Sequence, residues 1–294
     1  MLGSYRLGIW LTALMLWGTG SLAALLAVLH GQQTHGEILA FASDREGQRD
    51  IYLMDVAHGI TLNLTQDRMF DDAPAWSADG RLAFESYRSR GAAIMVMNTV
   101  TYDIEQVTNS AGNYSPAWSP DGQLAYVTTR SANLDVMLLD FSSGEHSDIS
   151  GNPGDDMNPA WSPDGRIAFD SFNEDQIIGQ IFIRNPGTGA GRGVQDSQHY
   201  YDPTWSYDGR LAVVSSLAGN ADIYLMDPVT GEATPYVHSL ADETQPAWSA
   251  SGLLAYVVGY RDGFGEIYVF NSATGETRNL TRNDLNDFSP AWMP

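Results

Sequence analysis

The sequence predicts an all-β protein: a six-bladed β-propeller of four-stranded antiparallel blades, preceded by one transmembrane helix. Two observations lead to this prediction. A short phrase, Pro-Ala-Trp-Ser-x-Asp-Gly or a close variant, recurs six times along the chain, and an uncharged stretch, 7–29, lies near the N-terminus. We therefore divide the chain into an N-terminal anchor 1–30, a linker 31–36 and a propeller 37–294.

The recurring phrase has the period of a propeller blade. Its tryptophans are Trp76, Trp118, Trp161, Trp205, Trp248 and Trp292. They follow one another at intervals of 42 to 44 residues, and a four-stranded blade takes about 40 to 45 residues. Residues 38–41 match the second strand of a repeat, whereas 290–292 match a first strand alone. The two ends are therefore expected to complete one blade and to close the ring.

Each repeat also contains the turns that join its strands. Ser119-Pro120-Asp121-Gly122 has Pro and Gly where a hairpin turn favours them. An apolar second strand follows, as in 124–127, and a third strand resembles 222–227. A second turn with Asp or Asn at its start leads to a polar fourth strand, because these side chains bond their own turn backbone.

The uncharged stretch 7–29 is long enough to cross a membrane. At 1.5 Å per residue its 23 residues span roughly 34 Å, against about 30 Å of hydrocarbon. Arg6 precedes it and no Arg or Lys follows in 30–36, so the N-terminus is expected in the cytoplasm and the propeller outside, in the periplasm. The alternative is a cleaved signal peptide, because Ser21 and Ala23 fit a small-x-small cleavage site.

Composition excludes several classes of function. The chain has 36 acidic and 15 basic residues, a formal charge of -21, so nucleic acid is excluded as an expected partner. It has no cysteine, which removes disulfides, thiolate catalysis and cysteine-bound zinc. Basic protein surfaces, cations and neutral ligands remain.

The phrases around each blade resemble a known family. Residues 41–47 form Phe-x-Ser-x-Arg-x-Gly, residues 50–55 form Asp-Ile-Tyr-x-Met-Asp, and both accompany the Pro-Ala-Trp-Ser-Pro-Asp-Gly phrase. Together they resemble the WD40-like (PD40) repeats of the TolB propeller family over 37–294. The resemblance implies a six-bladed propeller with a non-enzymatic role in binding envelope proteins. The α/β domain of TolB proteins has no counterpart in this sequence, where the hydrophobic segment precedes the propeller.

An acidic position recurs five residues before the repeated tryptophan, and four of its six occupants are carboxylates. The occupants are Asp71, Asn113, Asp156, Tyr200, Glu243 and Asp287. We expect them to gather at one mouth of the central channel, which predicts a partner- or ligand-binding site. Its candidate residues are Asp71, Asp72, Asp156, His199, Tyr200, Glu243 and Asp287. Such a ring could bind Ca²⁺ or a basic partner segment; alternatively these residues cap turns.

No catalytic centre is visible in the sequence. It has no Gly-x-Ser-x-Gly elbow and no His-Glu-x-x-His motif. The favoured function is a membrane-anchored, extracytoplasmic protein-protein interaction module, an accessory subunit of a membrane or envelope complex. The alternatives are a metal-assisted, lyase-like carbohydrate-active enzyme that uses the acidic mouth and His199, and a purely structural assembly protein. The loops 87–90, 173–179 and 260–264 are expected on the same face as the acidic mouth.

Overall fold

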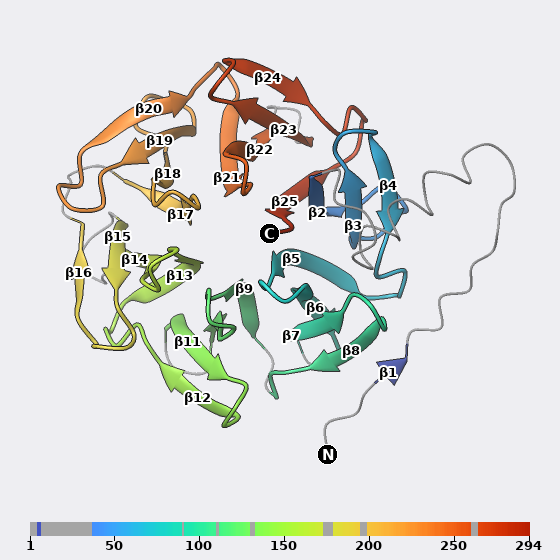
Figure 1. Ribbon diagram of the computed structural model, residues 1–294, viewed down its shortest axis with the longest axis horizontal. Coiled ribbons are helices and arrows are strands. Elements are labelled where there is room, and N and C mark those ends of the chain that lie inside the picture. Colours follow the sequence, from blue (N-terminus) through green and yellow to red (C-terminus); the bar gives the residue numbers. More distant parts are fainter. Residues whose placement is uncertain are drawn as a thin grey trace, which may run out of the picture.

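The computed structural model describes residues 5–6, 37–89, 91–109, 112–129, 133–172, 179–194, 199–259 and 264–294. These residues form six antiparallel sheets arranged around a central axis, with the first strand of each sheet nearest that axis (Figure 1). The prediction of an all-β, six-bladed propeller with four-stranded blades is confirmed.

The first three blades contain both ends of the propeller. Blade 1 contains β25 (Asp287–Trp292), β2 (Ile38–Ser43), β3 (Asp50–Asp55) and β4 (Ile60–Asn63). Blade 2 contains β5 (Phe70–Trp76), β6 (Arg81–Arg88), β7 (Gly91–Asn98) and β8 (Asp103–Gln106). Blade 3 contains β9 (Asn113–Trp118), β10 (Leu124–Thr128), β11 (Asp135–Asp140) and β12 (Glu145–Asp148).

The other three blades are each built from consecutive strands. Blade 4 contains β13 (Asp155–Trp161), β14 (Ile167–Phe172), β15 (Gln180–Arg184) and β16 (Gly191–Gly193). Blade 5 contains β17 (Tyr201–Trp205), β18 (Leu211–Ser215), β19 (Asp222–Met226) and β20 (Ala233–Val237). Blade 6 contains β21 (Asp242–Trp248), β22 (Leu253–Gly259), β23 (Gly265–Asn271) and β24 (Glu276–Asn279).

Blade 1 joins strands from opposite ends of the chain. β25 pairs with β2, and Leu39 lies opposite Trp292. The Arg45 guanidinium forms a 2.9 Å ion pair with Asp287, which is fully buried. The same guanidinium lies 4.6 Å from the centre of the Tyr52 ring, a cation-π distance. The N-terminal and C-terminal parts of the propeller are thus held together by a strand pair and an ion pair.

The core consists of the interfaces between blades. All six residues of β2 are buried, although a strand with one solvated face would alternate buried and exposed side chains. Leu39 and Phe41 of β2 pack in one cluster with Val257 and Ile267 of blade 6. Each blade is therefore covered on both faces by its neighbours, and no blade has a complete core of its own.

The Ser-x-Asp-Gly phrase forms the turn between the first two strands. In blade 2 the Ser77 hydroxyl accepts a 2.8 Å hydrogen bond from the Arg81 amide, and Gly80 has a φ of +84°. A residue with a Cβ is strained at this φ, which accounts for the repeated glycine. The turn also aims Arg81 at the next blade, where its guanidinium lies 4.4 Å from the Trp118 ring centre.

In five of the six blades, all except blade 2, the recurring tryptophan meets the preceding blade in one of two ways. Arg166 and Arg210 cover the tryptophans of blades 5 and 6 as Arg81 covers that of blade 3. Gln123 and Leu253 stand in place of this arginine in two blades. There the following tryptophans donate their indole N–H to backbone carbonyls, from Trp161 to Ala117 at 3.1 Å and from Trp292 to Ala247 at 3.0 Å.

The predicted membrane segment 7–29 and the linker 31–36 lie outside the described residues. Among the residues described, no helix has the length and apolar character needed to cross a membrane. The two-residue strand β1 (Tyr5–Arg6) pairs with the outer edge of β8, opposite Asp103 and Ile104. This pairing and a membrane-spanning 7–29 with a cytoplasmic N-terminus exclude each other, because they place Tyr5 on opposite sides of the membrane.

Removal of residues 290–294 is expected to abolish cooperative thermal unfolding. The shortened chain loses the Trp292 contacts and the partners of Leu39 and Ala40, so that the first part of β2 is left as an exposed strand edge. Circular dichroism and calorimetry of the full chain and the truncated chain measure this loss. A chain without Pro294 alone serves as control, and equal melting of all three chains would show that the β25 contacts contribute little.

Candidate functional site

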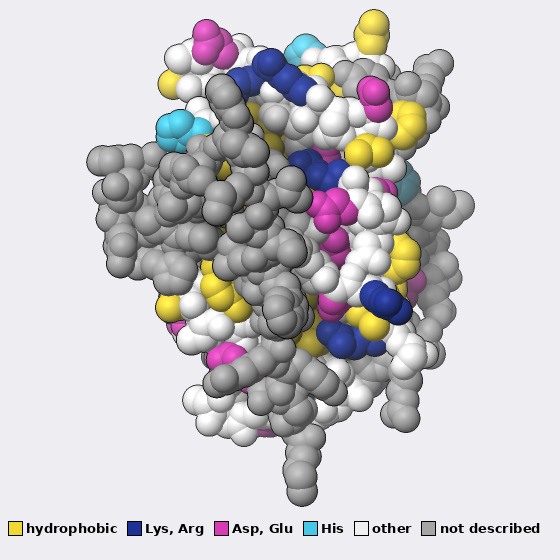
Figure 2. All heavy atoms as spheres, turned by 90° about the vertical axis from the view of Figure 1, so that its right-hand side faces the viewer, with side chains coloured by type: hydrophobic (Ala, Val, Ile, Leu, Met, Phe, Trp, Pro, Cys, Tyr) yellow, Lys and Arg dark blue, Asp and Glu magenta, His cyan; other side chains and the backbone are white. Residues whose placement is uncertain are grey.

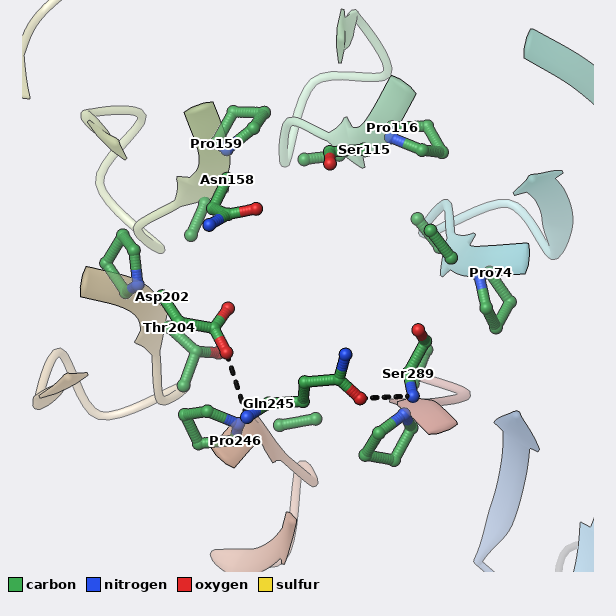
Figure 3. Close-up of a pocket in the computed structure, with 18 of the residues that line it drawn as sticks. Pro74, Ser115, Pro116, Asn158, Pro159, Asp202, Thr204, Gln245, Pro246 and Ser289 are labelled. Atoms are coloured by element: carbon green, nitrogen blue, oxygen red, sulfur yellow. Dashed lines mark hydrogen bonds between the residues drawn. The ribbon is translucent and has the colours of Figure 1, made fainter. Parts of the chain in front are cut away.

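A central cavity of about 570 Å³ lies where the first strands of the six blades converge (Figure 3). Every blade contributes three residues to the cavity wall: the proline of the recurring phrase, the residue before it and the residue after it. The six residues before proline are Ala73, Ser115, Asn158, Asp202, Gln245 and Ser289. The cavity is thus lined by one set of equivalent positions.

These six residues share an unusual backbone conformation. Their φ angles lie between +48° and +55°, in the left-handed region that residues other than glycine seldom adopt. At the same point the register between the first and second strands shifts, for example between Asp72 and Ala75. Such a β-bulge re-aims the side chain at the extra residue. In Figure 3 the side chains of Asn158, Asp202 and Gln245 point toward the cavity.

A chain of hydrogen bonds connects neighbouring blades around the cavity. The Asp202 amide donates to the Asp170 carboxylate, and the Gln245 amide donates to Asp202, both at 2.8 Å. The Ser289 amide in turn donates to the Gln245 side-chain oxygen at 2.8 Å (Figure 3). The Ser289 hydroxyl then donates to Asp72 at 2.9 Å. The strained bulges of blades 5, 6 and 1 are therefore each held by a side chain from the blade before them.

On the other side of the ring, one bulge is held by the preceding blade and one is bonded within its own blade. In blade 3 the Ser115 amide donates to Glu85 of blade 2 at 2.7 Å. In blade 4 the Asn158 side chain donates to Asp170 at 2.7 Å. Asp170 thus receives hydrogen bonds from two bulge residues in adjacent blades.

The cavity is acidic. The lining residues that the structure describes include the carboxylates of Asp72, Glu85 and Asp202 and no arginine or histidine. Asp72 is partly neutralised from behind by Arg49, whose guanidinium lies 2.5 Å away. By contrast, Figure 2 shows arginine and acidic side chains close together on the outer side of the molecule.

Burial raises the pKa values of two cavity carboxyls, Glu85 and Asp202. The pKa of Glu85 rises to about 7 and that of Asp202 to about 6, in both cases mainly because the side chain is removed from water. The pKa of Asp170, beside Asp202, is raised well above its ordinary value by burial and by the neighbouring charge. The negative charge of the cavity therefore increases as the pH rises through neutrality.

The structure places most of the sequence-predicted site residues away from the cavity. Of the seven, Asp72 alone is among the described residues of the cavity wall. Asp71, Asp156, Tyr200, Glu243 and Asp287 are at most 3% exposed and lie between strands. Alternate side chains of a strand face opposite sides, so that Asp71 is buried where its neighbour Asp72 faces the cavity. A role of these five residues in binding a partner or ligand stays a prediction.

The buried acidic residues are hydrogen-bonded to the loops that precede their strands. Asp156 accepts two bonds from the Asn152 amide group, and Glu243 accepts the Ser239 hydroxyl. Glu243 also borders a separate hollow of about 960 Å³ beside Tyr256 and Tyr268. His199 is half-buried and does not line the central cavity.

The other sequence predictions about the site have mixed outcomes. Tyr87, from the first of the three expected partner loops, lines the cavity. The segments 173–178 and 260–263 of the other two loops lie outside the described residues.

Within the described part of the chain, no group of three or more His, Asp or Glu side chains is placed to hold a metal ion.

Comparison with known proteins identifies similar chains. Residues 73–209 match the family described as the TolB beta propeller domain. A TolB homolog of Chlorobium luteolum is 28% identical over 71% of this chain and 39% of its own length. The uncharacterized peptidase YuxL of Bacillus subtilis is 29% identical over 32% of this chain and 15% of its own length.

A solved structure shows the same fold. TolB from Acinetobacter baumannii superposes with a TM-score of 0.78 at 21% identity, over 92% of this chain and 70% of that one. The chain spans between 15% and 39% of the length of the curated relatives it matches. These relatives therefore support the propeller, and their whole activities do not transfer with it.

Replacement of Gln245 by Ala is expected to lower the free energy of unfolding by about 1–2 kcal/mol, because the Ser289 amide loses its acceptor in a partly buried position. Urea unfolding measures the change. Gln123→Ala, a glutamine outside the cavity wall, is the matched control and should have a smaller effect. Equal losses in the two variants would show that the blade-to-blade hydrogen bond is not a significant source of stability.

Proposed function

Since the chain is a TolB-like six-bladed β-propeller, we propose that it is a protein-protein interaction module whose central cavity receives a cationic segment of its partner. The observation that supports this proposal is the charge of the cavity wall, where Asp72, Glu85 and Asp202 lie without an arginine or histidine among the described lining residues. A partner arginine or lysine would supply the missing positive charge.

The charge of the whole chain supports the same partner chemistry. A net charge of -21 attracts cationic segments over a distance, and a cavity with low-dielectric walls concentrates that potential. Complementary charges of this kind increase association rates and favour one partner over another. Binding should therefore weaken as the salt concentration rises.

We propose a non-catalytic role for this module. The cavity wall carries the hydroxyls of Ser115 and Ser289, but no histidine is among its described residues to activate them as nucleophiles. The similarity to a protein named as a peptidase covers 15% of that protein. This similarity supports a shared propeller fold and does not support a proposal of hydrolytic activity.

We further propose that segment 7–29 anchors the module in a membrane, with the propeller on the extracytoplasmic side as an accessory subunit of a membrane or envelope complex. Its length and lack of charge support this proposal. The pairing of β1 with β8 is the competing arrangement, in which the N-terminal residues stay with the propeller.

Loss of two cavity charges is expected to weaken binding of a cationic peptide about tenfold. The probe is a hexa-arginine peptide, titrated by calorimetry into the full chain and into an Asp202→Asn, Glu85→Gln double variant. Both substitutions keep an oxygen that can accept the bulge hydrogen bonds. An Asp121→Asn, Glu276→Gln variant loses the same charge at exposed positions. Equal affinities of the two double variants would contradict binding in the cavity.

Purification from native membranes is expected to yield the whole chain of 32.1 kDa, resistant to carbonate extraction. Intact-mass analysis of the extracted protein makes this measurement. It also identifies any protein that accompanies the chain in mild detergent. A shorter mass that corresponds to cleavage after Ala23, together with release by carbonate, would replace the anchor with a signal peptide.

A further inference from the structure

In blades 1, 4 and 6 the buried acidic residue of the first strand accepts a hydrogen bond from a side chain four residues earlier. In blade 4 the Asn152 side chain donates to both oxygens of Asp156, at 2.9 and 2.8 Å. In blade 1 the Asn283 side chain donates to Asp287 at 2.6 Å. The same arrangement connects Ser239 and Glu243 in blade 6. In these three blades, therefore, a hydrogen-bond donor stands four residues before the buried carboxylate.

Blade 2 breaks this rule. The residue four before Asp71 is Asp67, which has no side-chain N–H to donate. Asp71 has no exposed surface and lacks the donor four residues earlier, so that the hydroxyls of Ser86 and Thr65 are the groups that favour its charged form. The Ser86 residue lies opposite Asp71 on β6 and is fully buried as well. A buried carboxylate in this state is destabilising when it is charged.

The groups around Asp71 add negative charge. Asp67 in the preceding loop and Asp50 on β3 both raise its pKa, in addition to burial, which is the main cause. The hydroxyls of Ser86 and Thr65 lower it, and the resulting pKa is about 7. Glu46 in turn adds to the negative potential at Asp50.

The guanidinium of Arg49, whose backbone bonds to Asp71, is paired with other carboxylates. The Arg49 carbonyl accepts the Asp71 amide at 2.9 Å. Its guanidinium, however, pairs with Asp44 at 3.2 Å and with Asp72 at 2.5 Å. The charged groups that face Asp71 are therefore carboxylates, and a proton is the ligand that relieves this arrangement at least cost.

We propose that Asp71, faced by Asp67, is a proton-binding site that couples the stability of blade 2 to pH near neutrality. With the proton bound, the Asp71 side chain is neutral and can donate a hydrogen bond to Ser86, which lies opposite it. Without it, β5 buries an uncompensated charge next to Asp72, which lies in the cavity wall. This inference concerns the stability of the scaffold and does not depend on the proposed partner.

The direction of the pH effect follows from proton linkage. A folded-state pKa near 7, against about 3.9 for an unfolded aspartate, means that the folded chain holds more protons between these values. Stability from this site is complete below about pH 4 and is lost as the pH rises to about 7. Between pH 5.5 and 8.5 the unfolding equilibrium constant is expected to rise on the order of 30-fold through Asp71 alone.

Urea unfolding of the full chain in nonionic detergent at pH 5.5 and 8.5 tests the proposal. Asp67→Asn restores the donor that blades 1 and 4 possess and should reduce the pH-dependent rise at least several-fold relative to the natural chain. Asp71→Asn removes the titrating group and should abolish the whole part of the pH-dependent rise that comes from Asp71. Asp121→Asn, at an exposed turn position, is the control and should retain the natural rise.

The two variants make the outcome decisive. If the unfolding equilibrium constant of Asp67→Asn rises with pH as much as that of the Asp121→Asn control, the proposal is overturned, even if Asp71→Asn fails to fold. A reduced rise in Asp67→Asn would support it, because this variant keeps Asp71 and changes only the group that faces it. Other buried carboxyls, such as Glu85, contribute equally to all the chains and cancel in the comparison.

Discussion

The propeller depends on the burial of both faces of every blade. Second strands such as β2 and β18 have no exposed side chain, so each of these sheets needs a neighbour on either side. A linear row of such blades would leave two apolar faces in water, at a cost proportional to their area. The pairing of β25 with β2 builds the last blade from both ends of the propeller, and the Arg45–Asp287 ion pair ties those ends together.

The same constraint produces the cavity. Six first strands that converge on an axis cannot all pack there, and each instead bulges at the residue before proline. The bulge exposes a backbone N–H, which a side chain from the preceding blade accepts in blades 1, 3, 5 and 6. Asp202 and Gln245 therefore have two roles, since they hold the next blade in place and form the cavity surface. Substitutions there change binding and scaffold together unless they keep the acceptor.

The sequence predicts the blades better than the site. The spacing of the tryptophans determines the number of repeats, and the Ser-x-Asp-Gly phrase determines the first turn. The direction of Asp71 could not be predicted, because the bulge adds one residue and changes which side chains face the axis. A signal for the cavity was nevertheless present: the residue before proline differs between blades, from Ala73 to Gln245, while proline itself does not.

Because the blades repeat one structure, equivalent positions in different blades can be compared directly. Asp156 and Asp287 show how the fold accommodates a buried carboxylate, through an asparagine four residues earlier. Asp71 occupies the equivalent position in the same type of strand, but Asp67 replaces that asparagine, and the arginine that pairs with Asp287 in blade 1 has no counterpart among the described groups around Asp71. The absence of a donor is thus a property of this one blade and not of the architecture. It follows that titration of Asp71 affects blade 2 first, at the strand that carries Asp72 to the cavity wall.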